Sequence, residues 1–112
     1  MLPHSQKINT QLFKEVLVGG KTYNSTYFSI KILKIPNKDF KSRFTCVVSK
    51  KVIKKAVSRN LFKRRFFNII QEIYEGLPSS WAVVFFLKTG GEKLTFKDLK
   101  KELLKIFENI KM

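Results

Sequence analysis

The feature that most limits how this chain can fold is an unbroken apolar run of seven residues, Trp81–Leu87 (WAVVFFL). A helix that spans a membrane needs about 20 apolar residues, so this run is too short for that role. A strand covered on both faces of its sheet is apolar at every position, whereas a strand with one face exposed to solvent alternates between apolar and polar residues. We therefore predict that residues 81–87 form a central strand, covered on both faces.

Strands are also predicted before this run, at 21–24, 26–35 and 41–49, because these segments are rich in β-forming residues or alternate in polarity. The residues expected to face the core are Phe28, Ile30, Ile32, Phe44, Cys46 and Val48. Between the two longer strands, the residues at 36–39 (PNKD) have the composition of a turn. A strand, a tight turn and a second strand predict a hairpin, so we expect these two strands to pair.

Three helices are predicted, at 10–18, at about 55–75 and after Thr95, because apolar residues recur there on one helical face. The apolar face of the first is expected at Leu12, Phe13, Val16 and Leu17, that of the second at Phe62, Phe66, Ile69, Ile70 and Ile73, and that of the third at Leu99, Leu103, Ile106 and Ile110.

The ends of these helices have recognisable signals. Asn9 or Thr10 can cap the first helix. The glycine pair at 19–20 is expected to end it through the freedom of glycine at positive φ. Thr95 with Asp98 approximates a capping box for the last helix.

The element order is therefore α-β-β-β-α-β-α. Three helices against one sheet of about four strands make an α+β fold, a two-layer sandwich. At 112 residues the chain is long enough for one core, so we expect a single domain, residues 1–112. Residues 1–8 are expected to form a polar arm that becomes ordered on contact with a partner.

A long stretch without acidic residues lies between the predicted third strand and the second helix. From Phe40 to Gln71 the chain has no Asp or Glu. Within it, eight cations fall between residues 50 and 65: Lys50, Lys51, Lys54, Lys55, Arg59, Lys63, Arg64 and Arg65. The whole chain has 23 Lys and Arg against 8 Asp and Glu, a net charge of +15. Because uncompensated cations repel one another, this segment predicts a polyanionic partner, and a nucleic acid is the first class to consider.

Few residues are suited to catalysis or metal binding by the chain itself. His4 is the only histidine and has no positioned partner for acid–base chemistry. Cys46 is the only cysteine, which excludes an internal disulfide, and with His4 it falls short of a zinc ligand set. Cys46 is expected to be a small buried residue. The first ten residues lack the apolar core of a signal peptide, so a cytoplasmic protein is expected.

Short motifs follow one another across the basic segment: Ser49-Lys50-Lys51, Ala56-Val57, Arg59-Asn60 and Lys63-Arg64-Arg65. In this order they resemble the signature of the bacterial ribonuclease P protein subunit. The order of the predicted elements is similar too, so the resemblance covers nearly the whole chain. Two positions that are usually basic in that family are apolar here, Leu61 and Phe67.

The resemblance implies a role in removing the 5′ leader from precursor tRNA. In that family the RNA subunit is the catalyst and Mg²⁺ ions activate the attacking water, so neither a catalytic residue nor a protein-only metal site is expected here. The protein would dock on the catalytic RNA subunit and bind the leader of the precursor tRNA. The residues expected to bind RNA are Lys50, Lys51, Lys54, Lys55, Arg59, Asn60, Lys63, Arg64 and Arg65. The leader-binding cleft is expected between the first helix and the sheet, at Phe13, Leu17 and Lys31.

Other classes of function stay open on the residues alone. One is a ribosome-associated or general RNA-binding protein without an enzymatic role. Another is a peripheral membrane protein, which would need a basic amphipathic helix with an exposed Trp or Leu, and none is expected. A protein nuclease would need closely spaced carboxylates for a metal, which the sequence lacks. No protein partner is predicted.

Overall fold

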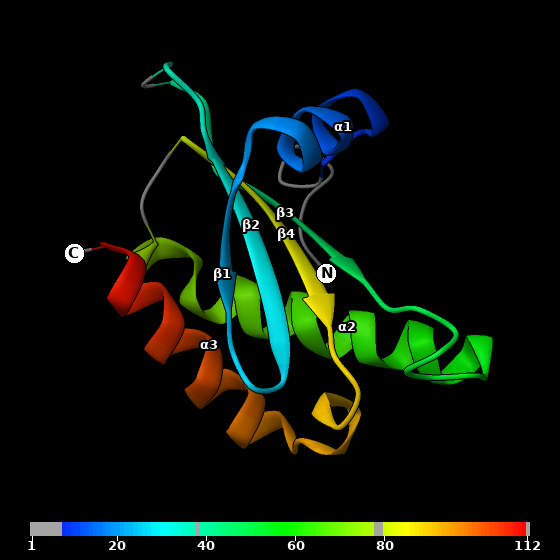
Figure 1. Cartoon of the computed structure of the whole chain (residues 1–112). Helices are drawn as coiled ribbons and strands as arrows, with labels where there is room; N and C mark the ends of the chain where they lie inside the picture. Colours follow the sequence, from blue (N-terminus) through cyan, green and yellow to red (C-terminus); the bar gives the residue numbers. More distant parts are fainter. Residues whose placement is uncertain (1–7, 38, 78–79, 112) are drawn as a thin grey trace.

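Figure 1 shows the computed structural model of the chain, which describes residues 8–37, 39–77 and 80–111. The helices and strands are α1 (Thr10–Gly19), β1 (Lys21–Asn24), β2 (Phe28–Lys34), β3 (Arg43–Val47), α2 (Ala56–Ile73), β4 (Trp81–Leu87) and α3 (Phe96–Lys111). Two short 3₁₀ helices, η2 (Tyr74–Gly76) and η3 (Gly91–Lys93), follow α2 and β4. The predicted order and the α+β class are confirmed. His4 and most of the predicted arm lie outside the described residues.

The four strands form one sheet in the order β1-β2-β4-β3. β4 pairs antiparallel with β2, from Phe28 opposite Leu87 to Lys34 opposite Trp81, and it pairs in parallel with β3. The prediction that residues 81–87 form a central strand is confirmed. The predicted hairpin between the second and third strands is wrong, because β4 lies between them.

The connection from β2 to β3 wraps around the residue that precedes β4. The Ile35 N–H donates to the Ser80 carbonyl at 2.7 Å, and the Ser80 N–H donates to the Phe40 carbonyl at 2.9 Å. The Ser80 hydroxyl also donates to the Asn37 carbonyl at 2.7 Å. These bonds hold the β2–β3 connection around the residue before β4. The apolar β4 lies between β2 and β3 and pairs with both of them.

Alternate residues of β4 enter two cores on opposite faces of the sheet. The larger core contains Trp81, Val83, Phe85 and Leu87 together with buried residues of α2 and α3. The smaller core joins Ala82 and Val84 to Leu12 and Val16 of α1. In Figure 1, α2 and α3 accordingly lie on one side of the sheet and α1 on the other. Burial on both faces explains why β4 has no polar position.

Phe85 anchors α2 to the sheet. Its ring centroid lies 4.9 Å from that of Phe28, 4.6 Å from that of Phe66 and 6.2 Å from that of Phe62. Aromatic pairs at these separations add to the stabilisation from buried area. The first half of α2 is therefore held firmly against the sheet, with its other side facing solvent.

The ends of α1 show one confirmed and one wrong expectation. The Asn9 side chain accepts a hydrogen bond from the Leu12 N–H at 2.8 Å, as predicted for a cap. Gly20 follows the helix with φ −77°, so positive φ is not the reason for glycine there. A Cβ at Gly20 would collide with the Val16 carbonyl oxygen. The glycine is needed for close approach.

The core-facing side of α3 differs from the prediction. Leu99 and Leu103 are buried as expected, but the third buried residue is Phe107, which is 1% exposed. Ile106 and Ile110 are only half-buried at the margin of the core. The larger ring of Phe107 reaches Phe44 of β3, with its centroid 6.4 Å away. The N-terminal cap is confirmed, since Thr95 Oγ1 accepts from the Asp98 N–H at 3.2 Å.

The other predicted core residues follow the expected alternation. All six inward-facing residues of the two longer strand segments are buried, Cys46 among them, and so are four of the five in α2. Ile73, at the end of α2, is half-buried.

Candidate nucleic-acid interface

The basic segment forms a turn, residues 49–55, followed by the first half of α2. The turn is tight, because the Ser49 carbonyl accepts hydrogen bonds from the Val52 and Ile53 N–H groups, each at 3.1 Å. α2 then begins at Ala56 with neither an acidic residue in its first turn nor a side-chain cap. Since the N-terminal end of a helix carries partial positive charge, the helix and the lysines before it add to the same positive potential.

Most of the residues predicted to bind RNA lie at the surface. Those that are exposed are Lys50, Lys51, Lys54, Lys55, Asn60, Arg64 and Arg65. Arg59 and Lys63 are half-buried. The ion pair found among the described residues joins Lys100 to Glu72 at 2.9 Å, and no residue between 50 and 65 takes part in one. Within the described part of the chain, the positive charge of this segment is therefore not neutralised.

Arg59 holds the turn in place. Its Nη1 donates to the Lys54 carbonyl at 2.7 Å and to the Ile53 carbonyl at 3.1 Å. Because a guanidinium has five N–H donors, others remain for a phosphate. Arg59 therefore positions the turn as well as contributing charge, a role that sequence reasoning missed.

The cations surround the first half of α2 on several sides. Asn60 and Arg64 are four residues apart and exposed, so they share the outward-facing side. Lys63 faces β3, since its charge partly opposes the rise that burial causes in the pKa of the Cys46 thiol. Arg65 faces η3, because it lines a pocket there with Glu92. A bound polyanion can therefore contact cations across the width of the helix.

The two apolar residues at usually basic positions have different environments. Phe67 packs against the larger core, with its ring centroid 5.4 Å from that of Phe66. Leu61 is 44% exposed, and Val57, one helical turn before it, is 79% exposed. The expectation that the basic helix exposes no Leu is therefore wrong. The helical period of the apolar residues did not predict the exposed Leu61, because that period identifies which residues face the core and does not show whether the solvent side also has apolar residues.

The residues predicted for the leader-binding cleft lie along α1 and β2. The Lys31 Nζ donates to the Leu17 carbonyl at 3.2 Å, where the C-terminal end of α1 favours a cation. Leu17 is 37% exposed. Phe13 is half-buried and packs against the smaller core, as do Val47 of β3 and Phe86 of β4. Leu17 and Lys31 are thus brought together, and Phe13 lies one turn earlier on the same helix.

Two pockets were not predicted from the sequence. One, of about 530 Å³, lies beside α1 and is lined by Lys14, Glu15, Val18, Gly19 and Leu33, without the three predicted cleft residues. The other, of about 310 Å³, is lined by Val52, Ile53, Ser58, Leu61, Phe62, Arg65 and Glu92. The spacing of Ser58, Leu61 and Arg65 could have indicated a shared helical face. No sequence signal indicated that Glu92 would join them.

In the described residues, no three His, Cys, Asp or Glu side chains lie close enough together to hold a metal ion. No helix in the described ranges is both long enough and apolar enough to cross a membrane.

Comparison with known proteins gives a consistent result. The Ribonuclease P family model matches residues 2–111. A ribonuclease P protein component from Pseudanabaena sp. is 34% identical over 113 residues, which cover 100% of this chain and 97% of the relative. Another from Microcystis aeruginosa is 30% identical over 105 residues, covering 91% and 88%. A solved RNase P protein from Thermotoga maritima is 21% identical, with a TM-score of 0.81 over 92% of this chain and 96% of that one.

The fold and the surface define a small, strongly basic α+β protein with an exposed, positively charged face. The chain belongs to the Ribonuclease P family. Its function is that of a ribonuclease P protein component, which is part of a ribonuclease and takes part in tRNA processing.

Proposed function

We propose that this chain docks on the catalytic RNA subunit through the turn at 49–55 and the first half of α2, and assists that RNA in removing the 5′ leader from precursor tRNA. The observation that carries the proposal is the exposed positive charge of this segment, which has no acidic partner among the described residues. Contacts with phosphates would compensate it and release counterions, which favours binding. A role in tRNA processing also supports a cytoplasmic location.

We assign catalysis to the RNA subunit. The described residues of this chain offer no cluster of His, Cys, Asp or Glu that could hold a metal ion. Mg²⁺ would act with the RNA subunit, where it can activate water and stabilise the leaving oxygen. The contribution of this chain is electrostatic, because cations placed between two polyanions lower their repulsion.

We also propose that the single-stranded leader runs beside α1, over Phe13, Leu17 and Lys31. Unpaired bases stack on aromatic side chains, and the half-buried Phe13 is held in place by the smaller core. The Lys31 ammonium has three donors, one of which is used by the Leu17 carbonyl. The remaining donors are available to a phosphate of the leader.

The docking proposal is tested by reconstitution at low Mg²⁺, where charge supplied by the protein matters most. The protein is mixed with a bacterial ribonuclease P RNA and a 5′-extended precursor tRNA, with RNA-alone and protein-alone controls. We expect cleavage at the mature 5′ end only when both components are present. RNA binding without any gain in cleavage would instead favour a general RNA-binding protein. Cleavage by the protein alone would contradict the assignment of catalysis.

The leader proposal is tested with Phe13→Ala in the same reconstituted system. Stacking contributes about 1–3 kcal/mol per base, so affinity for the precursor should fall roughly fivefold or more, while affinity for tRNA without a leader stays unchanged. Phe96→Ala, at an exposed phenylalanine of α3, is the matched control and should affect neither. Equal losses for both substrates would show that Phe13 acts through folding rather than through the leader.

A further inference from the structure

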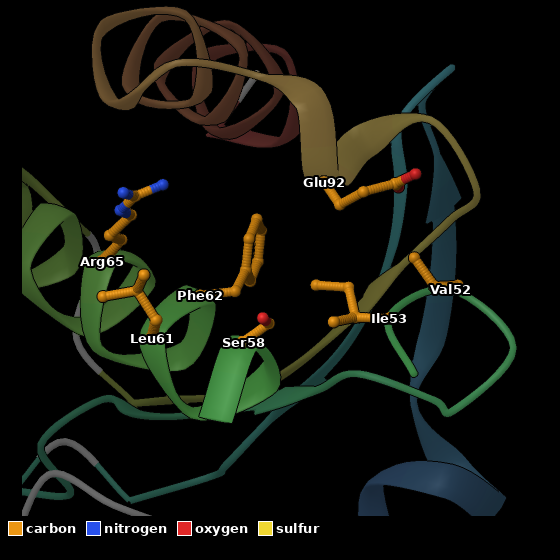
Figure 2. A pocket seen from close by; sticks show the side chains of 7 residues that line it. All are labelled: Val52, Ile53, Ser58, Leu61, Phe62, Arg65 and Glu92. Carbon is orange, nitrogen blue, oxygen red and sulfur yellow. The ribbon is translucent and has the colours of Figure 1, made fainter. Parts of the chain in front are cut away.

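The 310 Å³ pocket between α2 and η3 borders the docking surface and shares Arg65 with it. Its volume is at the lower end of the range of ligand sites, about 300–1,000 Å³. The residues that line it come from three parts of the chain, the turn at 49–55, α2 and η3, and are labelled in Figure 2. Because η3 is distant in sequence from the turn and from α2, the pocket exists only in the folded protein.

The walls of the pocket are fixed by bonds within the protein. Arg59 holds the turn that carries Val52 and Ile53, through the carbonyls described above. On the other side, a Cβ at the buried Gly91 would collide with the Tyr27 carbonyl oxygen, so η3 is closely packed. Since both walls are ordered beforehand, a ligand would bind with little loss of conformational entropy in the protein.

The lining combines apolar surface with two opposite charges. Leu61 presents exposed apolar surface, and the Phe62 ring also lines the pocket. In Figure 2, Arg65 and Glu92 lie on opposite sides of that ring. The Glu92 carboxylate is held by the Gly90 N–H, which donates to it at 2.8 Å. Among the described residues neither Arg65 nor Glu92 forms an ion pair.

These properties match a flat molecule with apolar faces and with both donors and acceptors on its edge. Arg65 can only donate hydrogen bonds, and an ionised Glu92 can only accept them. A nucleobase has this distribution of groups. The cations of the turn and of α2 would bring the sugar–phosphate backbone of an RNA to the mouth of the pocket.

We propose that this pocket receives one unpaired base of the bound RNA, and that guanine is the preferred base. The inference rests on the proposed function, since it requires RNA at the docking surface. Guanine offers two neighbouring N–H groups, N1 and N2, to Glu92, and two acceptors, O6 and N7, to the fork of Arg65. Uracil has a single N–H donor on its edge and matches Glu92 less completely.

The test uses two eight-nucleotide RNA probes, an oligouridylate and the same oligomer with one central guanosine. Their dissociation constants are measured by fluorescence anisotropy at one salt concentration. A base-specific contact is worth about 1–3 kcal/mol, so the guanosine probe should bind roughly fivefold tighter or more. Glu92→Gln should abolish this preference and leave oligouridylate binding no weaker, because it removes a negative charge and keeps an oxygen that can accept from the Gly90 N–H.

Glu108→Gln is the matched control, because it makes the same charge change at an exposed position of α3. It should keep the guanosine preference. Loss of the preference in both variants would show a general electrostatic effect and overturn the inference.

An independent readout is the NMR spectrum of the methyl groups of Val52, Ile53 and Leu61. These signals should shift when the guanosine probe is added and stay in place with oligouridylate. Equal affinity for the two probes, with unmoved methyl signals, would overturn the pocket inference while leaving the proposed function intact. Failure to bind either probe or a ribonuclease P RNA would overturn the proposed function itself.

Discussion

The salt dependence of RNA binding gives a quantitative test of the docking surface. Six of the eight cations between residues 50 and 65 are exposed, the exceptions being Arg59 and Lys63. Each phosphate contact contributes about −0.7 to −0.9 to the slope of log K against log salt. Six contacts therefore predict a slope of about −4 to −5.

Removing one cation should reduce that slope by one contact. Arg64→Gln changes an exposed residue on the outward-facing side of α2, so it should weaken binding without disturbing the core. The slope should become shallower by about 0.7–0.9. The assay is fluorescence anisotropy of a labelled bacterial ribonuclease P RNA fragment, titrated with protein at several salt concentrations.

Lys101→Gln is the control, since it removes the same charge from an exposed position of α3. If α2 makes the contacts, this variant should keep the wild-type slope. Equal changes in both variants would mean that the net charge of the protein, and not the surface of α2, governs binding. A wild-type slope shallower than about −2 would also refute the reasoning, because too few phosphates would be contacted.

Other predictions concern the core and its neighbours. Phe107→Ala should lower the free energy of unfolding by about 3–5 kcal/mol, and Ile106→Ala by clearly less, in urea denaturation, because only Phe107 is fully buried; equal losses would contradict the described core. Gly91→Ala should cost about 1–3 kcal/mol, seen as a lower Tm, because its Cβ would collide with the Tyr27 carbonyl; an unchanged Tm would show that η3 can move. Burial raises the pKa of the Cys46 thiol, so it should stay protonated and unreactive toward a thiol reagent at pH 8 until the protein is unfolded; rapid labelling of the native protein would show that the thiol is accessible.

The type of most elements could be predicted from local patterns. Alternation in β2 and β3 correctly placed Phe28 and Phe44 in the core, and the helical period correctly placed Phe66 there. These predictions succeed because side-chain direction in a strand or helix follows from the backbone geometry of the element itself. The choice between Ile106 and Phe107 was missed, because two adjacent apolar residues fit the helical period nearly as well and packing against Phe44 decides between them.

In the candidate site, too, some features could be predicted from the sequence and others could not. Its charge is a property of composition, so the lysines of the turn and Arg64 were identified from the sequence, and the structure finds them exposed. The bonds from Arg59 to the carbonyls before α2 were not predicted, since they depend on how the turn closes. The placement of Glu92 in the same pocket as Arg65 depends on the packing of η3 and likewise had no local signal.

By itself, the sequence determined that this chain builds a sheet around residues 81–87, exposes an excess of positive charge ahead of and along α2, and resembles one family of RNA-processing proteins. Only the tertiary structure decided that β4 lies between β2 and β3, that α1 covers the opposite face, and that a pocket forms beside Arg65. The physical reason is that periodicity and charge are carried by neighbouring residues. Strand order and pockets instead depend on which distant surfaces give the best burial and hydrogen bonding.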